Sequence, residues 1–141
     1  MHKQIFAVSK ENYTITADVT LMNKDLVVII TGGDVPHLGG IVSYDHKSRM
    51  SEKIYFDSHD GRKHKDIFLA ERFAERIQDR LPGNLCVTAG VHIDGITQAQ
   101  IEASFPMTVE LAQQVLDWTL EFENEFDEPQ YTTHLKNFKF K

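Results

Sequence analysis

Residues 13–30, Y-T-I-T-A-D-V-T-L-M-N-K-D-L-V-V-I-I, decide the fold of this chain. Over residues 13–21 apolar and polar side chains alternate, and a period of two is typical of a strand with one buried and one wetter face. Residues 23–25 (N-K-D) predict a turn. Residues 26–30 are apolar without alternation and rich in β-branched side chains, which predicts a central strand that is covered on both faces.

Further outward, three more segments have the composition of strands: residues 39–44, 53–56 and 85–93. An apolar stripe at helical spacing predicts a helix over residues 66–81. Thr97 and Gln100 fit the capping box of a short helix, which Pro106 is expected to end. Thr108 fits the N-cap of a second, longer helix. We therefore expect an α+β fold, with a single largely antiparallel sheet of about six strands covered by two or three helices.

The length and composition are those of one globular domain, which we expect residues 1–141 to form. The net charge of −6 works against non-specific binding to nucleic acid or anionic membranes. No apolar run approaches the roughly 20 residues of a membrane helix, and the first residues lack the apolar stretch of a signal peptide. Cys86, the only cysteine, is typical of a small core residue in a reducing compartment. These features predict a cytoplasmic protein that binds neither nucleic acid nor membranes.

The acidic run at residues 121–128, E-F-E-N-E-F-D-E, ends the last predicted helix, where the helix dipole is already negative. Basic groups are needed to compensate this charge. The C-terminal K-N-F-K-F-K at residues 136–141 and a partner protein are the two candidate sources.

The first segment that could carry chemistry is residues 31–40, T-G-G-D-V-P-H-L-G-G, where the chain leaves the predicted central strand. Gly32 and Gly33 allow backbone N–H groups to approach a ligand, and Pro36 stiffens the loop that presents His37. The segment lacks the ending of a phosphate-binding P-loop. The alternative interpretation is an ordinary turn between strands.

The second segment is residues 58–66, S-H-D-G-R-K-H-K-D, which contains His59. Arg62, His64 and Lys65 stand just before or within the first turn of the predicted helix, where cations oppose the helix dipole. Such a cluster is favourable when an anion lies among these side chains and the free N–H groups of the helix. The segment therefore predicts an anion site, and the alternative is a solvated basic loop with Asp66 as the helix cap.

The third segment is residues 89–95, A-G-V-H-I-D-G, on a predicted strand. Gly90 and His92 share one face of that strand, and Asp94 follows shortly after. A glycine there would leave a hole beside the histidine, which favours a ligand. The alternative is a hydrogen-bonded core histidine.

The histidines also raise the possibility of catalysis. Their spacing is not that of a zinc site, although His37, His59, His64 and His92 could still converge in space. No serine lies on a G-x-S-x-G turn, so the sequence offers no activated nucleophile. General acid–base chemistry by His37 or His92 stays open, because histidine titrates near neutrality.

Taken in this order, the three segments resemble the LpdD-like family, the small D subunits of bacterial gallate decarboxylases. The likeness runs from about residue 13 to residue 118 and is carried by three motifs. These are T-G-G-D-V-P-H-L-G (31–39), F-D-S-H-D-G-R-K-H-K-D with A-E-R-F-A-E-R-I (56–77), and T-A-G-V-H-I-D-G-I-T-Q-A-Q-I (88–101). The family's domain is described as a prenylated-flavin chaperone.

The resemblance implies an accessory protein that is not itself the catalyst. Its partner would be the large subunit of a UbiD-type decarboxylase, which uses prenylated FMN to remove carbon dioxide from hydroxylated aromatic acids. A flavin prenyltransferase makes that cofactor, and the accessory protein would bind it, as prenylated FMN or FMN, and deliver or stabilise it. The expected cofactor-binding residues are Gly32, Gly33, His37, His59, Arg62, His64, Lys65 and His92.

Two other function classes remain open from the residues alone. One is a small histidine- or metal-dependent hydrolase or decarboxylase. The other is a purely structural decarboxylase subunit that binds no ligand. A homodimer is compatible with each of these, since two-fold dimers are common among small proteins.

Overall fold

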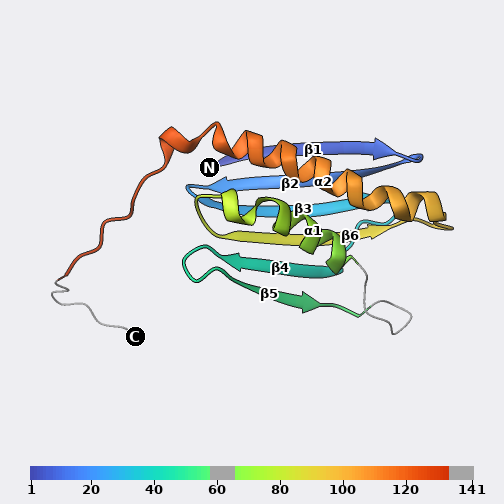
Figure 1. Ribbon diagram of the computed structural model, residues 1–141, viewed down its shortest axis with the longest axis horizontal. Coiled ribbons are helices and arrows are strands. Elements are labelled where there is room, and N and C mark those ends of the chain that lie inside the picture. Colours follow the sequence, from blue (N-terminus) through green and yellow to red (C-terminus); the bar gives the residue numbers. More distant parts are fainter. Residues whose placement is uncertain (58–65, 134–141) are drawn as a thin grey trace.

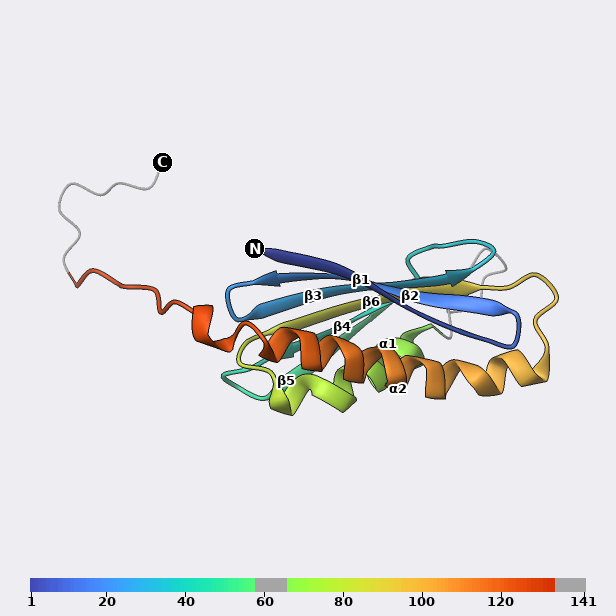
Figure 2. The same cartoon turned by 90° about the horizontal axis from the view of Figure 1, so that it is seen from above.

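The computed structural model describes residues 1–57 and 66–133, in which one sheet carries helices on a single face (Figures 1 and 2). In chain order the elements are β1 (His2–Lys10), β2 (Tyr13–Met22), β3 (Asp25–Gly33), β4 (Gly40–Asp45), β5 (Met50–Tyr55), α1 (Ile67–Ile77), β6 (Leu85–His92) and α2 (Gln98–Leu120). Short 3-10 turns follow the two helices at Gln78–Arg80 and Glu123–Glu125. The predicted α+β class is confirmed.

The sheet is mixed rather than purely antiparallel. Its strand order is β1-β2-β3-β6-β4-β5, and β6 pairs with β3 in parallel while the other neighbours are antiparallel. The reason lies in α1, which connects β5 to β6 and lets the chain cross over before it enters the sheet. A parallel pair requires such a long connection, and β6 is thereby inserted between β3 and β4.

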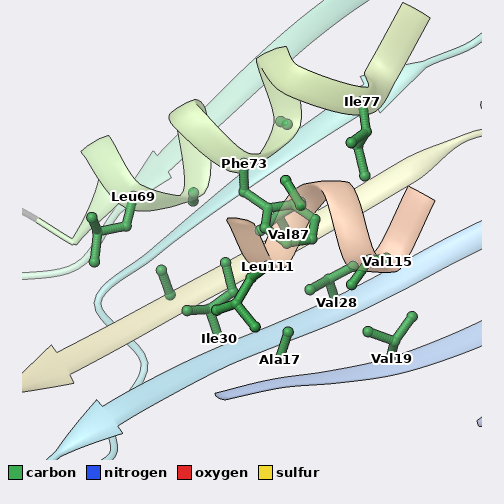
Figure 3. Close-up of a cluster of buried hydrophobic side chains, with 14 of the residues drawn as sticks. Ala17, Val19, Val28, Ile30, Leu69, Phe73, Ile77, Val87, Leu111 and Val115 are labelled. Atoms are coloured by element: carbon green, nitrogen blue, oxygen red, sulfur yellow. The ribbon is translucent and has the colours of Figure 1, made fainter. Parts of the chain in front are cut away.

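The core lies between the sheet and the two helices (Figure 3). Phe73 of α1 and Leu111 of α2 lie in this core and are fully buried. On β3 the inward side chains Val28 and Ile30 are 0% exposed, whereas Ile29 between them is 46% exposed. The expectation that this strand is covered on both faces is therefore wrong, because both helices lie on the same side of the sheet (Figure 2).

The sequence patterns did not predict β1, which forms an edge of the sheet beside β2. A tight turn at Glu11 and Asn12 joins the two strands, and both residues have positive φ, 51° and 63°. A two-residue turn with this geometry matches the twist of paired strands. Phe6 and Val8 of β1 then pack against the core, with Phe6 in edge contact with Trp118.

The final helix is one continuous element rather than two. The predicted capping box is confirmed: the Thr97 hydroxyl accepts from the Gln100 N–H, and the Gln100 side chain accepts from the Thr97 N–H. Pro106 lies inside α2 and does not end it. Thr108 is buried within the same helix, and its hydroxyl donates to the carbonyl of Ser104 one turn earlier, so it is no cap. Burial of the following apolar stripe outweighs the one backbone bond that proline removes.

We expect Thr97→Ala to lower the free energy of unfolding by about 1 kcal/mol, because the Gln100 N–H at the start of α2 loses its acceptor, the Thr97 hydroxyl. Urea denaturation followed by the fluorescence of Trp118, the single tryptophan, measures this change. Gln114→Ala, in the middle of the same helix, is the control and should leave stability nearly unchanged. Equal stability of the two variants would show that the cap contributes nothing.

Residues of the N-terminal half contact the acidic run after α2, and one of them, Lys24, carries a positive charge. Asn23 exchanges two hydrogen bonds with the backbone of Asp127, at 2.7 and 2.8 Å. Lys24 forms an ion pair with Glu128, and the His2 ring stacks on Phe122 at 3.8 Å between ring centroids. The basic segment 136–141 lies outside the described residues.

Candidate functional site

Two of the three segments singled out in the sequence meet at one end of the sheet, and Asp66, the one described residue of the third segment, bonds to both of them. The parallel strands β3 and β6 end side by side there, with Gly33 paired to His92. The first residue of α1, Ile67, lies against the start of β4 at Gly40. Crevices outside the carboxyl ends of parallel strands are common ligand sites in sheets with helical cover. We call this region the site edge. It lies at the carboxyl ends of the two central strands, not at an outer strand, and is defined by Asp34, His37, Asp66, His92 and Asp94.

His37 is held by hydrogen-bond acceptors on both sides of its ring. Nε2 lies 2.8 Å from Oδ2 of Asp66, and Nδ1 lies 3.0 Å from the carbonyl oxygen of Val35. A backbone carbonyl can only accept, so Nδ1 must carry a proton to bond it. The hydrogen bond between His37 and Asp66 ties the 34–39 loop to the start of α1.

Asp66 is a residue of the site edge whose contacts the sequence did not reveal. Its side chain is only 9% exposed, and its Oδ1 accepts from the N–H of Val91 at 2.9 Å. Although Asp66 occupies the N-cap position of α1, its side chain makes no cap hydrogen bond. Its carboxylate instead joins β6, the 34–39 loop and α1. The only sequence signal was an acid directly before a predicted helix, which ordinarily indicates a cap.

His92 belongs to a second, more exposed network. Its Nε2 lies 2.9 Å from Oδ1 of Asp94, and the Asp94 N–H donates to the Asp34 carboxylate at 2.8 Å. The Asp34 N–H in turn donates to the His92 carbonyl at 2.6 Å. The first and third predicted segments are therefore joined directly. The His92 side chain is 51% exposed, so a ligand at this edge can reach its ring.

Gly90 leaves no hole beside His92, contrary to the expectation from sequence. A methyl group at this position would overlap the backbone carbonyl group of His37, which occupies the space. The 34–39 loop thus crosses directly over β6. The absence of a side chain at Gly90 allows this crossing and does not provide room for a ligand.

Gly32 and Gly33 also serve contacts between backbone segments. A Cβ at Gly32 would lie 2.6 Å from the carbonyl oxygen of Thr14 on β2, and one at Gly33 would overlap the carbonyl of His92. Gly33 has φ of +75°, a conformation that other residues adopt only with strain. Both glycines lie where β3 leaves the sheet, as expected. Their lack of a side chain lets the neighbouring strands β2 and β6 approach the start of the loop closely.

The remaining predicted site residues, His59, Arg62, His64 and Lys65, lie outside the described residues. The described chain reaches this gap at the site edge. On one side, the Phe56 N–H donates to the Gly39 carbonyl at 3.1 Å, and on the other side stands Asp66.

Exposed apolar side chains border the site edge. They belong to the loop, to the end of β5 and to the first turn of α1, and each is at least 37% exposed: Val35, Leu38, Tyr55, Phe56 and Phe68. Aromatic side chains beside polar groups suit a flat ring system with polar edges.

A metal site and a nucleophilic cysteine find little support in the part of the chain that the structure describes. Within residues 1–57 and 66–133, no three His, Cys, Asp or Glu side chains cluster as metal ligands would. Cys86 is half-buried on the sheet face opposite the helices rather than in the core, and burial raises the pKa of its thiol, which disfavours the nucleophilic thiolate. Over the same residues, no helix is long and apolar enough to cross a membrane.

A cavity of about 480 Å³ lies at the opposite end of the sheet, away from the site edge. Its lining includes His2, Leu21, Phe122 and Phe126. Gly32, Gly33, His37 and His92, the predicted site residues that the structure describes, do not contribute to it.

Comparison with known proteins gives the relationship of this chain. Residues 9–120 match the model of a family described as the prenylated flavin chaperone LpdD-like domain. The chain is also 39% identical over 126 residues to Protein LpdD of Lactiplantibacillus plantarum, a match that covers 89% of this chain and 92% of that protein. The fold, the meeting of the sequence motifs at one sheet edge, and these two matches show that the chain belongs to the family of LpdD-like prenylated flavin chaperones.

Proposed function

We propose that this protein is a non-catalytic accessory protein that binds prenylated FMN, or FMN, at the site edge. It would deliver the cofactor to, or stabilise it for, the large subunit of a UbiD-type aromatic-acid decarboxylase such as gallate decarboxylase. A flavin prenyltransferase would be the source of the cofactor. One observation carries the proposal: Asp34, His37, His92 and Asp94 converge where the parallel strands end, beside the start of α1.

The chemistry of the residues at the site edge fits a flavin phosphate. Acids are absent from the first turn of α1, so its N–H groups and the dipole favour an anion there. The Asp66 carboxylate just before the helix is compensated by the Val91 N–H and the His37 ring. Arg62, His64 and Lys65 directly precede α1 in the sequence and would supply further positive charge for the phosphate.

The ring system has candidate contacts as well. Phe56 and Phe68 are exposed beside the site edge and offer surfaces for stacking. His92, and His59 from the segment outside the described residues, would donate or accept hydrogen bonds at polar ring atoms. Gly32 and Gly33 would bring backbone N–H groups close to the ligand. A carrier needs binding without chemistry, which agrees with the absence of an activated nucleophile from the sequence motifs.

We expect Arg62→Ala to weaken the binding of FMN by at least about 1.5 kcal/mol, roughly tenfold in Kd, because a charge-assisted phosphate contact is lost. Fluorescence titration of FMN with purified protein measures the effect. The matched control is Arg80→Ala, since Arg80 lies in the turn after α1, at the far end of that helix. Binding by Arg62→Ala as tight as that of the control would exclude Arg62 from the phosphate site.

Co-expression with a flavin prenyltransferase tests the proposal directly. We expect the purified protein to retain a flavin, visible in its absorbance spectrum and by the mass of prenylated FMN in native mass spectrometry. A colourless protein that takes up neither FMN nor prenylated FMN on titration would refute cofactor binding. In that case tight complex formation with the decarboxylase would favour a structural subunit instead.

A further inference from the structure

Asp94 is followed by Gly95 in a turn that leaves both residues open to solvent. This turn lies between β6 and α2, and the Asp94 side chain is 78% exposed. Gly95 has φ of +62°, and a methyl group at its position would meet nothing within 4 Å. Because glycine carries no side chain, nothing on Gly95 shields its backbone nitrogen from the side chain of Asp94.

The backbone N–H of Gly95 is available as a nucleophile. Among the residues that the structure describes, this N–H finds no hydrogen-bond acceptor. A bond from its nitrogen to the carboxyl carbon Cγ of Asp94 would close a five-membered ring. The covalent structure of the chain therefore keeps the nucleophile and the carboxyl carbon close together.

Other aspartates at the ends of strands lack this arrangement. The N–H after Asp25 donates to the Asn84 carbonyl at 2.9 Å, and the N–H after Asp45 donates to the Asn84 side chain at 2.9 Å. The N–H after Asp34 donates to a carbonyl of β6 at 3.4 Å. An N–H that the fold holds on an acceptor cannot turn toward the preceding carboxyl group. Asp94 differs from these three in having both an unbonded N–H and a glycine after it.

The His92 ring provides an acid beside the carboxyl group. Its Nε2 lies 2.9 Å from Oδ1 of Asp94, and its side chain is 51% exposed, so that the ring can exchange protons with solvent. Histidine titrates near neutrality. When the ring is protonated, Nε2 donates to Oδ1 and can transfer its proton as that oxygen departs. An unassisted carboxylate oxygen is a poor leaving group, so this proton is what the reaction needs.

We propose that Asp94 is a site of aspartate isomerisation that is promoted by His92. The Gly95 nitrogen bonds to Cγ of Asp94 while the bond from Cγ to Oδ1 breaks. Oδ1 leaves as water with one proton from the His92 ring and one from the Gly95 amide, and a neutral succinimide remains. Water then opens the ring: attack at Cγ restores aspartate, and attack at the main-chain carbonyl gives isoaspartate. No oxidant or reductant takes part, and the proposal does not depend on flavin binding.

Isomerisation would alter the site edge. The succinimide lacks the carboxylate that now accepts from His92, and isoaspartate lengthens the backbone by one methylene group. The hydrogen bond from the Asp94 N–H to the Asp34 carboxylate, which joins the first and third segments, would be displaced. If the site edge binds a flavin, the isomerised protein should bind it more weakly, and this consequence alone rests on the proposed function.

Digestion with endoproteinase Asp-N measures the reaction, because this protease cuts before aspartate and not before isoaspartate. A chain with Asp94 gives the fragments 79–93 and 94–116, whereas an isomerised chain gives the uncut fragment 79–116. We expect this uncut fragment to accumulate, by mass spectrometry, while the folded protein is incubated at neutral pH. His92→Gln should slow its accumulation at least about tenfold, because a positioned general acid contributes roughly 100-fold or more.

Gly95→Ala is the matched control. Its methyl group meets no neighbour, so Asp94 and His92 keep their places while the nitrogen becomes shielded. The uncut fragment should not accumulate in this variant. The unaltered protein in concentrated urea is the second comparison, because the same dipeptide then reacts without His92 held beside it. We expect accumulation there to be at least about tenfold slower than in the folded protein.

Two results would overturn the proposal. One is complete cleavage before Asp94 after prolonged incubation of the folded, unaltered protein. The other is accumulation at the same rate in the folded protein, in urea and in His92→Gln, which would show that neither the fold nor the histidine promotes the reaction.

Discussion

Gly90→Ala is expected to lower the free energy of unfolding by at least about 3 kcal/mol, near the upper end of the range for overpacking a closed site. The added methyl group would overlap the backbone carbonyl of His37. A backbone group cannot turn away as a flexible side chain can, so the 34–39 loop must lift from β6. Because that loop also carries the ring of His37 to Asp66, lifting it would break the hydrogen bond between them.

Gly95→Ala is the matched control for this substitution. A methyl group at Gly95 meets nothing within 4 Å, and the cost there arises only from its φ of +62°. We expect about 1 kcal/mol for that strain. Urea denaturation of both variants, followed by the fluorescence of Trp118, gives the comparison. If Gly90→Ala cost no more than Gly95→Ala, the crossing of the loop over β6 would be incorrect.

Asp66→Ala is expected to cost about 2 to 5 kcal/mol, because two hydrogen bonds of a buried carboxyl group are lost and each group left unsatisfied costs about 1 to 3 kcal/mol. The substitution takes acceptors from the His37 ring and from the Val91 N–H at once. Water reaches this pair poorly, since the His37 side chain is 22% exposed and that of Asp66 only 9%. Asp66→Asn keeps one acceptor for Val91 and should cost less.

The chain contains a matched control in its second histidine–aspartate pair. His92 and Asp94 lie 2.9 Å apart, almost the same distance as the buried pair, but their side chains are 51% and 78% exposed. We expect Asp94→Ala to cost less than about 1 kcal/mol, because exposed pairs contribute little. Chemical denaturation of the two variants separates burial from distance as the source of the stability. Equal costs would show that burial of the Asp66 pair is not what matters.

A double-mutant cycle assigns the Asp66 effect to its partner. We expect His37→Gln and Asp66→Ala to be non-additive by at least about 1 kcal/mol, since contacting residues in one network are coupled. FMN titration of the same variants then addresses function. Loss of flavin binding in a variant that remains folded would support a role of the pair in holding the site edge together.

Local patterns in the sequence determined most of the secondary structure. Alternation predicted β2, the apolar stripe predicted α1, and Thr97 with Gln100 predicted the start of α2. Each of these signals is contained within a few residues of its own element, because strand and helix periods and capping contacts are local. The motifs around His37 and His92 likewise identified two segments that meet at one edge.

Tertiary structure alone decided the features that join distant residues. Asp66 bonds His37 and Val91, which are 29 and 25 positions away, and no local pattern distinguishes that carboxylate from an ordinary helix cap. Pro106 stays within α2 because the burial of the residues that follow it outweighs one lost backbone bond. The reading of Gly90 as a gap failed because the carbonyl that fills the space comes from the loop after β3. The sheet topology places this carbonyl beside Gly90. Because β6 lies between β3 and β4, the loop that joins β3 to β4 has to cross over β6.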